Sequence, residues 1–93
     1  MKQWKTHKLR KLIKTLIRFR KEEDLLNFFR DLCTLEELAV LSSRWEAVQL
    51  LAAGLPYRDI AKKTGLSTAT VTRIAHWLHH GEGGYQKALK QKH

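Results

Sequence analysis

Cysteine, proline and acidic side chains are all scarce in this chain of 93 residues. The one cysteine, Cys33, cannot form an intrachain disulfide or a metal site by itself, so the composition suits a reducing compartment. No run of about 18 apolar residues occurs, and the basic start MKQWKTHKLRK leads into no unbroken apolar stretch. We therefore expect neither a membrane span nor an export signal, and we predict a cytoplasmic protein.

Positive charge dominates the composition. Eighteen Lys and Arg stand against nine Asp and Glu, which gives a formal net charge of +9. A surplus of this size attracts polyanions, so nucleic acid and an anionic membrane surface are the two candidate partners. No combination of Ser, His and acid and no pair of carboxylates stands out, so the protein is not expected to be an enzyme. The length indicates a single small domain, 1–93, whose thin core would gain from dimerisation.

The apolar residues repeat with the period of α-helices, and no segment indicates a β-strand. Between residues 7 and 20, positions 9, 12, 13, 16 and 17 are Leu or Ile and form one face, with Lys and Arg around it. A second amphipathic helix is predicted over 22–32. The sequence Thr34-Leu35-Glu36-Glu37 has the form of a capping box, which predicts a third helix over 35–53. These helices, about 7–53, are the predicted dimerisation region.

The segment 57–79 has the pattern of a helix-turn-helix. A short helix is predicted from Tyr57 to Lys63 or Thr64, and Gly65 provides the turn after it. Ser67 is placed to cap a second helix that runs to about residue 79. The apolar residues fall where two short, steeply crossing helices would share a core, namely Ile60, Leu66, Val71, Ile74 and Leu78. A glycine-rich turn and a short basic helical tail follow, so the expected fold class is all-α.

The outward face of the second predicted helix carries short, polar or cationic side chains. Thr and Ala meet thymine methyl groups, Thr hydroxyls bond base edges or phosphate, and Arg reads guanine or grips the backbone. The amides at the helix start are free to bind a phosphate. We therefore predict that the helix that begins near Ser67 reads the major groove of duplex DNA. The predicted DNA-binding residues are Arg58, Lys62, Ser67, Thr68, Ala69, Thr70, Thr72, Arg73 and His76.

The stretch from about Phe28 to Leu78 resembles the Trp repressor family, and GLPYRDIAKKTGLSTATVTRIAHWLHHGEGGY resembles its YerC/YecD-type relatives. The motifs that carry the likeness are DLCTLEEL, SRWEAVQLL and STATVTR, followed by GEGGY, which the repressor itself lacks. The resemblance implies a Trp repressor-like multi-helical fold, an intertwined homodimer and a transcriptional regulator that acts as a repressor. Such a dimer binds a near-palindromic operator whose half-sites lie roughly 10 bp apart.

The resemblance also implies a place for a small effector. The two arginines that flank the corepressor in the Trp repressor correspond to Arg44 and Arg73, and a threonine near that pocket corresponds to Thr34. A glycine and a ligand-contacting serine of the tryptophan-binding protein are replaced by Ile74 and Trp77, whose bulk takes up space that an indole needs. We therefore do not expect L-tryptophan to be the corepressor. The candidate effector pocket consists of Thr34, Arg44, Arg73 and Trp77.

Several alternatives stay open at this point. The helix-turn-helix motif also serves as a protein- or RNA-interaction module. Lys and Arg around the apolar face of residues 7–20 also suit a peripheral membrane helix. Arg44 is equally suited to a structural ion pair with Asp31 or Glu37. His76 and His80 have the i, i+4 spacing of a helical metal chelate, but no further ligand is placed to complete it, so no metal is predicted.

Overall fold

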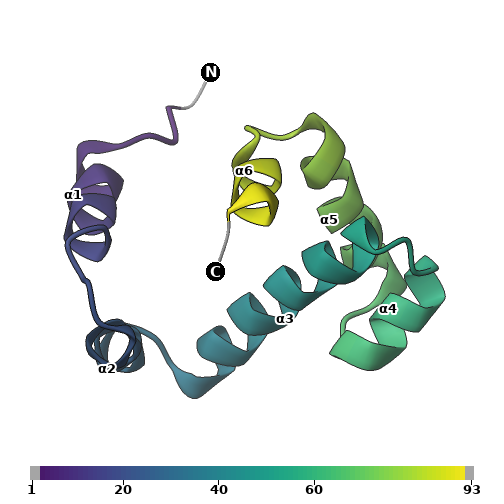
Figure 1. Ribbon diagram of the computed structural model, residues 1–93, viewed down its shortest axis with the longest axis horizontal. Helices are drawn as coiled ribbons and strands as arrows, with labels where there is room; N and C mark the ends of the chain where they lie inside the picture. The colour runs from purple at the N-terminus through teal and green to yellow at the C-terminus, as the bar shows by residue number, and fades with distance from the viewer. Residues whose placement is uncertain (1–2, 92–93) are drawn as a thin grey trace. The chain divides into compact units, whose positions relative to one another are not determined.

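The computed structural model describes residues 3–91, which contain six α-helices (Figure 1). They are α1 (His7–Leu16), α2 (Glu22–Leu32), α3 (Leu35–Ala52), α4 (Tyr57–Thr64), α5 (Thr68–His80) and α6 (Gly84–Lys90). No strand occurs over this range, and the all-α prediction is confirmed. No helix of the described part is long and apolar enough to cross a membrane. The chain divides into two units, with the boundary between Leu38 and Ala39.

The first helix is shorter than the sequence predicts. The sequence predicts an amphipathic helix over residues 7–20, with the last position of its apolar face at residue 17, but α1 ends at Leu16. Beyond that point the backbone tightens, because the Arg18 N–H donates to the Thr15 carbonyl and the Phe19 N–H to the Leu16 carbonyl, both at 3.2 Å. The turn brings the Phe19 ring within 5.3 Å of the Phe28 ring on α2, measured between centroids. Helical periodicity reflects only neighbouring residues, so it cannot predict that the chain turns after Leu16 to bring Phe19 to Phe28.

The predicted capping box is present at the start of α3. The Glu37 N–H donates to the Thr34 hydroxyl oxygen at 3.0 Å, and the Thr34 N–H donates to the Glu37 carboxylate at 2.8 Å. Each of these backbone donors would otherwise have no partner in the helix. The helix therefore begins at Leu35, where the sequence places it.

Replacing Thr34 with Ala should lower the free energy of unfolding by about 1 kcal/mol, because the Glu37 N–H loses its acceptor. Thr34→Ser keeps the hydroxyl and is the matched control, expected within about 0.5 kcal/mol of the parent. Urea denaturation followed by circular dichroism measures both values. An equal loss in the two variants would assign the effect to the methyl group and contradict the capping explanation.

The buried core lies in the unit that begins at Ala39. Val48 of α3, Ile60 of α4 and Val71 of α5 are each 0% exposed. Ile74 and Leu78 extend the same cluster along α5. The apolar side chains that the helix-turn-helix pattern places in a shared core are therefore buried there, with Leu66 partly buried against them.

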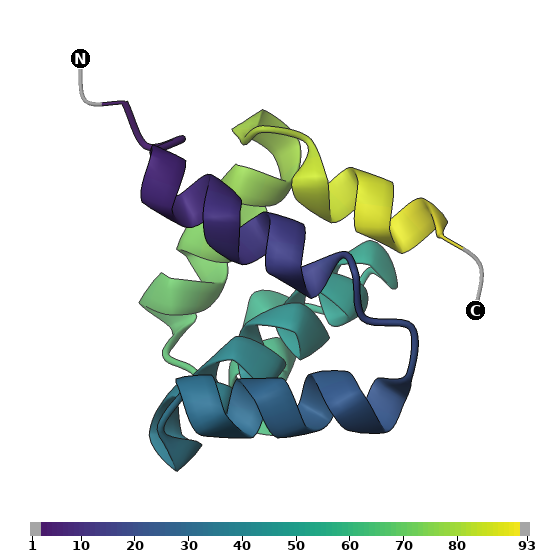
Figure 2. The same cartoon turned by 90° about the vertical axis from the view of Figure 1, so that its left-hand side faces the viewer.

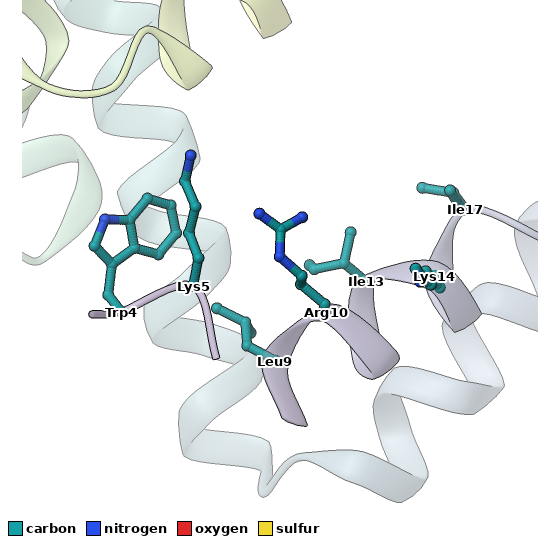
Figure 3. Close-up of a pocket in the computed structure, with 7 residues that line it drawn as sticks. All are labelled: Trp4, Lys5, Leu9, Arg10, Ile13, Lys14 and Ile17. Carbon is teal, nitrogen blue, oxygen red and sulfur yellow. The ribbon is translucent and has the colours of Figure 1, made fainter. Parts of the chain in front are cut away.

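The unit that ends at Leu38 contains no buried residue among those described. Its helices nevertheless carry apolar faces, and Ile17 is 75% exposed while Leu26 is 54% exposed. Along α1 the side chains enclose a largely apolar hollow of about 360 Å³ (Figure 3). We call it the N-terminal groove, which is lined by Trp4, Lys5, Leu9, Arg10, Ile13, Lys14 and Ile17. A largely apolar hollow with a basic rim is typical of an interaction site.

Candidate nucleic-acid interface

The turn between α4 and α5 is held by a glycine and a threonine. Gly65 has a left-handed backbone (φ 78°), which side chains with a Cβ rarely adopt, and its N–H donates to the Ala61 carbonyl at 2.9 Å. The Thr64 hydroxyl donates to the Ile60 carbonyl at 2.8 Å and accepts from the Leu66 N–H at 3.2 Å. These bonds fix the direction in which the chain leaves α4 and therefore where α5 begins.

Ser67 caps α5, as the sequence predicts. Its hydroxyl oxygen accepts from the Thr70 N–H at 3.1 Å, and its O–H donates to the Thr70 hydroxyl oxygen at 2.9 Å. Thr70 is partly buried, whereas Thr68 and Ala69 are exposed. Thr70 is therefore the least exposed of these predicted DNA-binding residues, relative to its size.

The two sides of α5 differ sharply in exposure. Val71, Ile74, Ala75 and Leu78 form its buried side. The exposed side carries Thr68, Ala69, Thr72, Arg73 and His76 from the predicted DNA-binding set, and Arg58 and Lys62 are exposed on α4. The Thr72 O–H donates to the Thr68 carbonyl at 2.9 Å, so its oxygen remains free to accept a hydrogen bond. Short polar and cationic side chains on one exposed face are of the types that pair with base edges.

The charge of the two helices favours a polyanion. Between residues 57 and 80 the acidic side chain is Asp59, against Arg58, Lys62, Lys63 and Arg73. Three histidines lie in the C-terminal half of α5, and the ring centroids of His76 and His80 are 5.0 Å apart and those of His79 and His80 6.4 Å apart. Over residues 3–91, no three or more His, Cys, Asp or Glu side chains are placed so that they could hold a metal ion together.

A pocket of about 310 Å³ adjoins the buried side of α5. It is lined by Arg44 of α3, by Thr70, Arg73, Ile74 and Trp77 of α5, and by Tyr85 of α6. The pocket therefore brings together three of the four residues predicted for an effector site, and Thr34 lies in the other unit. The guanidinium groups of Arg44 and Arg73 have no hydrogen-bond or ion-pair partner among the described residues of the unit that begins at Ala39.

Tyr85 is a pocket residue that was not predicted from the sequence. The Tyr85 ring lies 6.5 Å from the Trp45 ring of α3, between centroids, and the residue packs against the buried core. The available signal was an aromatic residue directly after the glycine-rich turn. Ile74 and Trp77 both line the pocket, but Ile74 is 5% exposed and belongs to the core, whereas Trp77 keeps 56% of its surface exposed.

Comparison with known proteins gives four findings. The family model for the Trp repressor protein matches residues 7–93. The uncharacterised protein YerC of Bacillus subtilis is 36% identical over 81 residues, which cover 87% of this chain and 78% of YerC. The crystal structure of a TrpR-like protein from Eubacterium eligens superposes with a TM-score of 0.87 at 35% identity, over 92% of this chain and 89% of that one. A Staphylococcus aureus protein described as a candidate Trp repressor gives a TM-score of 0.84 at 30% identity, over 91% and 85%.

The likeness extends beyond the helix-turn-helix, a motif that serves many functions in unrelated proteins. The matched range of 7–93 includes α1 and α2 as well as the helix-turn-helix and α6. The Trp repressor-like multi-helical fold expected from the sequence is confirmed by these structural neighbours. The chain therefore belongs to the Trp repressor family, a family of helix-turn-helix DNA-binding regulators.

Proposed function

We propose that this protein is a cytoplasmic, sequence-specific repressor of transcription that places α5 in the major groove of duplex DNA. The observation that carries the proposal is the division of α5 into a buried apolar side and an exposed side of short polar and cationic side chains. The family membership and the excess of positive charge support it. The family membership favours a DNA regulator over a protein- or RNA-interaction module.

The exposed residues take distinct roles in this proposal. The backbone amides at Thr68 and Ala69, in the first turn of α5, bind a phosphate. Thr72 accepts a hydrogen bond from a base amino group, and Arg73 reads guanine or grips the backbone. Arg58 and Lys62 neutralise phosphates beside the groove, and each such contact steepens the salt dependence of binding. His76 extends the contact surface along α5, while Ser67 and Thr70 hold the start of the helix.

The proposal includes a homodimer built from the helices of residues 7–53. Support comes from α1 and α2, which have no buried residue among those described, and from the exposed apolar N-terminal groove. A second copy would cover that groove and give residues 1–93 the shared core of a single domain. The two reading helices of the dimer would then address half-sites about one helical turn apart.

Arg44, Arg73 and Trp77 form the candidate effector pocket in this proposal. Ile74 occupies the core beside them, so an indole has less room than in a pocket with glycine at that position. We expect operator binding to occur without L-tryptophan.

Selection of bound sites from random duplex DNA, with and without L-tryptophan, tests the proposal. The expected result is a near-palindromic sequence enriched equally in both pools. Enrichment only with L-tryptophan would overturn the assigned effect of Ile74 and Trp77. No enrichment, together with vesicle binding that survives high salt, would instead favour the membrane alternative. A reporter promoter that carries the selected site should lose expression when the protein is present.

A further inference from the structure

We infer that α6 holds α5 in its DNA-reading orientation, so that operator binding needs no small molecule in the pocket beside it. Tyr85 and Gln86 are the positioning residues. The inference rests on the proposed function, because it concerns what orients the reading helix.

Gln86 ties α6 to α5. Its side-chain amide donates to the Leu78 carbonyl at 2.9 Å, and this hydrogen bond is partly buried. The carbonyls of the last turn of a helix have no partner within the helix, so Gln86 satisfies a group that would otherwise need water. The bond therefore anchors the C-terminal end of α5.

Tyr85 ties the same short helix to α3. Its ring packs at 6.5 Å from the Trp45 ring, and Leu89, one turn further along α6, also packs against the buried core. Figures 1 and 2 show α6 turning back from the end of α5. Because Tyr85 contacts Trp45 and Gln86 bonds to Leu78, α6 bridges α3 and α5.

The turn between α5 and α6 allows the chain to fold back from the end of α5. The Gly81 N–H donates to the Trp77 carbonyl at 2.9 Å, and a Cβ at Gly81 would collide with that carbonyl oxygen. A residue with a side chain would thus push the chain away from α5. Glycine lets the chain fold back immediately, which places Tyr85 and Gln86 beside the helix end.

The pocket between α3 and α5 links the position of α6 to regulation. Arg44 lines the pocket from α3, and Arg73 and Trp77 line it from α5. A molecule bound there would contact both helices and favour the arrangement that it fits best. Tyr85 and Gln86 already connect the two helices within the chain, so the arrangement is present without a ligand.

The test compares Tyr85→Ala and Gln86→Leu with Tyr85→Phe and Lys87→Ala. Tyr85→Ala removes the ring contact, and Gln86→Leu removes the hydrogen bond. The control Tyr85→Phe keeps the ring, and the control Lys87→Ala changes an exposed neighbour on α6. We expect Tyr85→Ala and Gln86→Leu each to weaken binding to the selected operator about tenfold. Binding to a scrambled duplex and the salt slope should not change, because the cations that meet phosphate are untouched. The two controls should bind the operator like the parent.

A fall in operator and scrambled-duplex binding alike, or a lower thermal midpoint with unchanged operator binding, would overturn the inference. Hydrogen exchange gives a readout that does not need DNA. The amides from Leu78 to Gly81 should exchange about tenfold faster in Tyr85→Ala and Gln86→Leu, while the Val71 amide stays protected. Unchanged exchange at these amides would overturn the positioning role even if operator binding fails for another reason. Failure of the parent to select any operator would instead overturn the proposed function.

Discussion

Arg73→Ala should weaken operator binding about 10- to 100-fold, the range for loss of one well-formed arginine contact to a base. The side chain is exposed on the reading side of α5 and has no partner within its unit among the described residues. Its removal therefore leaves no buried group unsatisfied, and the free energy of unfolding should stay within about 0.5 kcal/mol of the parent. Fluorescence anisotropy with the selected duplex measures the affinity, and urea denaturation checks the fold.

The salt dependence and a second variant separate the two roles open to Arg73. If the guanidinium grips a phosphate, the slope of log affinity against log salt falls by about 1 in Arg73→Ala, and Arg73→Lys restores much of the binding. If it reads guanine, selectivity relaxes at one base pair, and Arg73→Lys recovers less because the planar fork is lost. Lys90→Ala, an exposed cation on α6, is the matched control. Unchanged DNA binding in Arg73→Ala, combined with loss of a protein partner, would refute the repressor proposal.

The double substitution Ile13→Asp and Ile17→Asp should convert the proposed dimer into monomers. Both side chains line the N-terminal groove, at 46% and 75% exposure, so charge there would have to enter an apolar interface without a partner. Operator affinity should then fall at least 100-fold, because two linked reading helices bind far more tightly than one. Analytical ultracentrifugation gives the mass, and anisotropy gives the affinity.

Lys11→Asp is the control for this prediction. It adds the same carboxylate to α1 at an exposed residue that does not line the groove, and it should leave the mass of the complex unchanged. A double variant that still sediments as a dimer would place the dimer interface elsewhere. A parent protein that sediments as a monomer would remove the homodimer from the proposal.

The N-terminal groove also bears on the membrane alternative. Lys5, Arg10 and Lys14 stand among its apolar residues, and the Lys5 ammonium lies 5.4 Å from the centroid of the Trp4 ring. Basic and aromatic side chains on one amphipathic face also occur in helices that lie on anionic membranes. A dimer explains the same exposed apolar residues, because a second copy of the chain would cover them. Sedimentation of the parent in the absence of lipid therefore separates the two interpretations.

Features set by neighbouring residues could be predicted from the sequence. The Thr34 capping box, the Ser67 cap and the turn at Gly65 each depend on groups within four residues of one another, so local sequence is enough to place them. The buried and exposed sides of α5 follow from helical periodicity alone. The fold class and the two sides of α5, one buried and one exposed, follow from these local features. The DNA-binding proposal depends on the exposed side.

Features set by distant contacts could not be predicted in the same way. The end of α1 depends on Phe19 meeting Phe28, and the wall of the pocket depends on Tyr85 meeting Trp45. Neither pair has a fixed spacing that a single sequence reveals, because the chain between them must first fold. For the same reason the sequence alone could not show that Thr70 would face a pocket rather than solvent.

By itself, then, the sequence determined an all-helical chain with a capped, two-sided helix from Thr68, because caps and periodicity act over one or two helical turns. Only the tertiary structure decided that Tyr85 lines the same pocket as Arg44 and Arg73 and that α6 bridges α3 and α5. Those relations depend on how helices from separate parts of the chain pack around Val48, Ile60 and Val71. Packing of this kind is a property of the folded core and has no counterpart in local sequence.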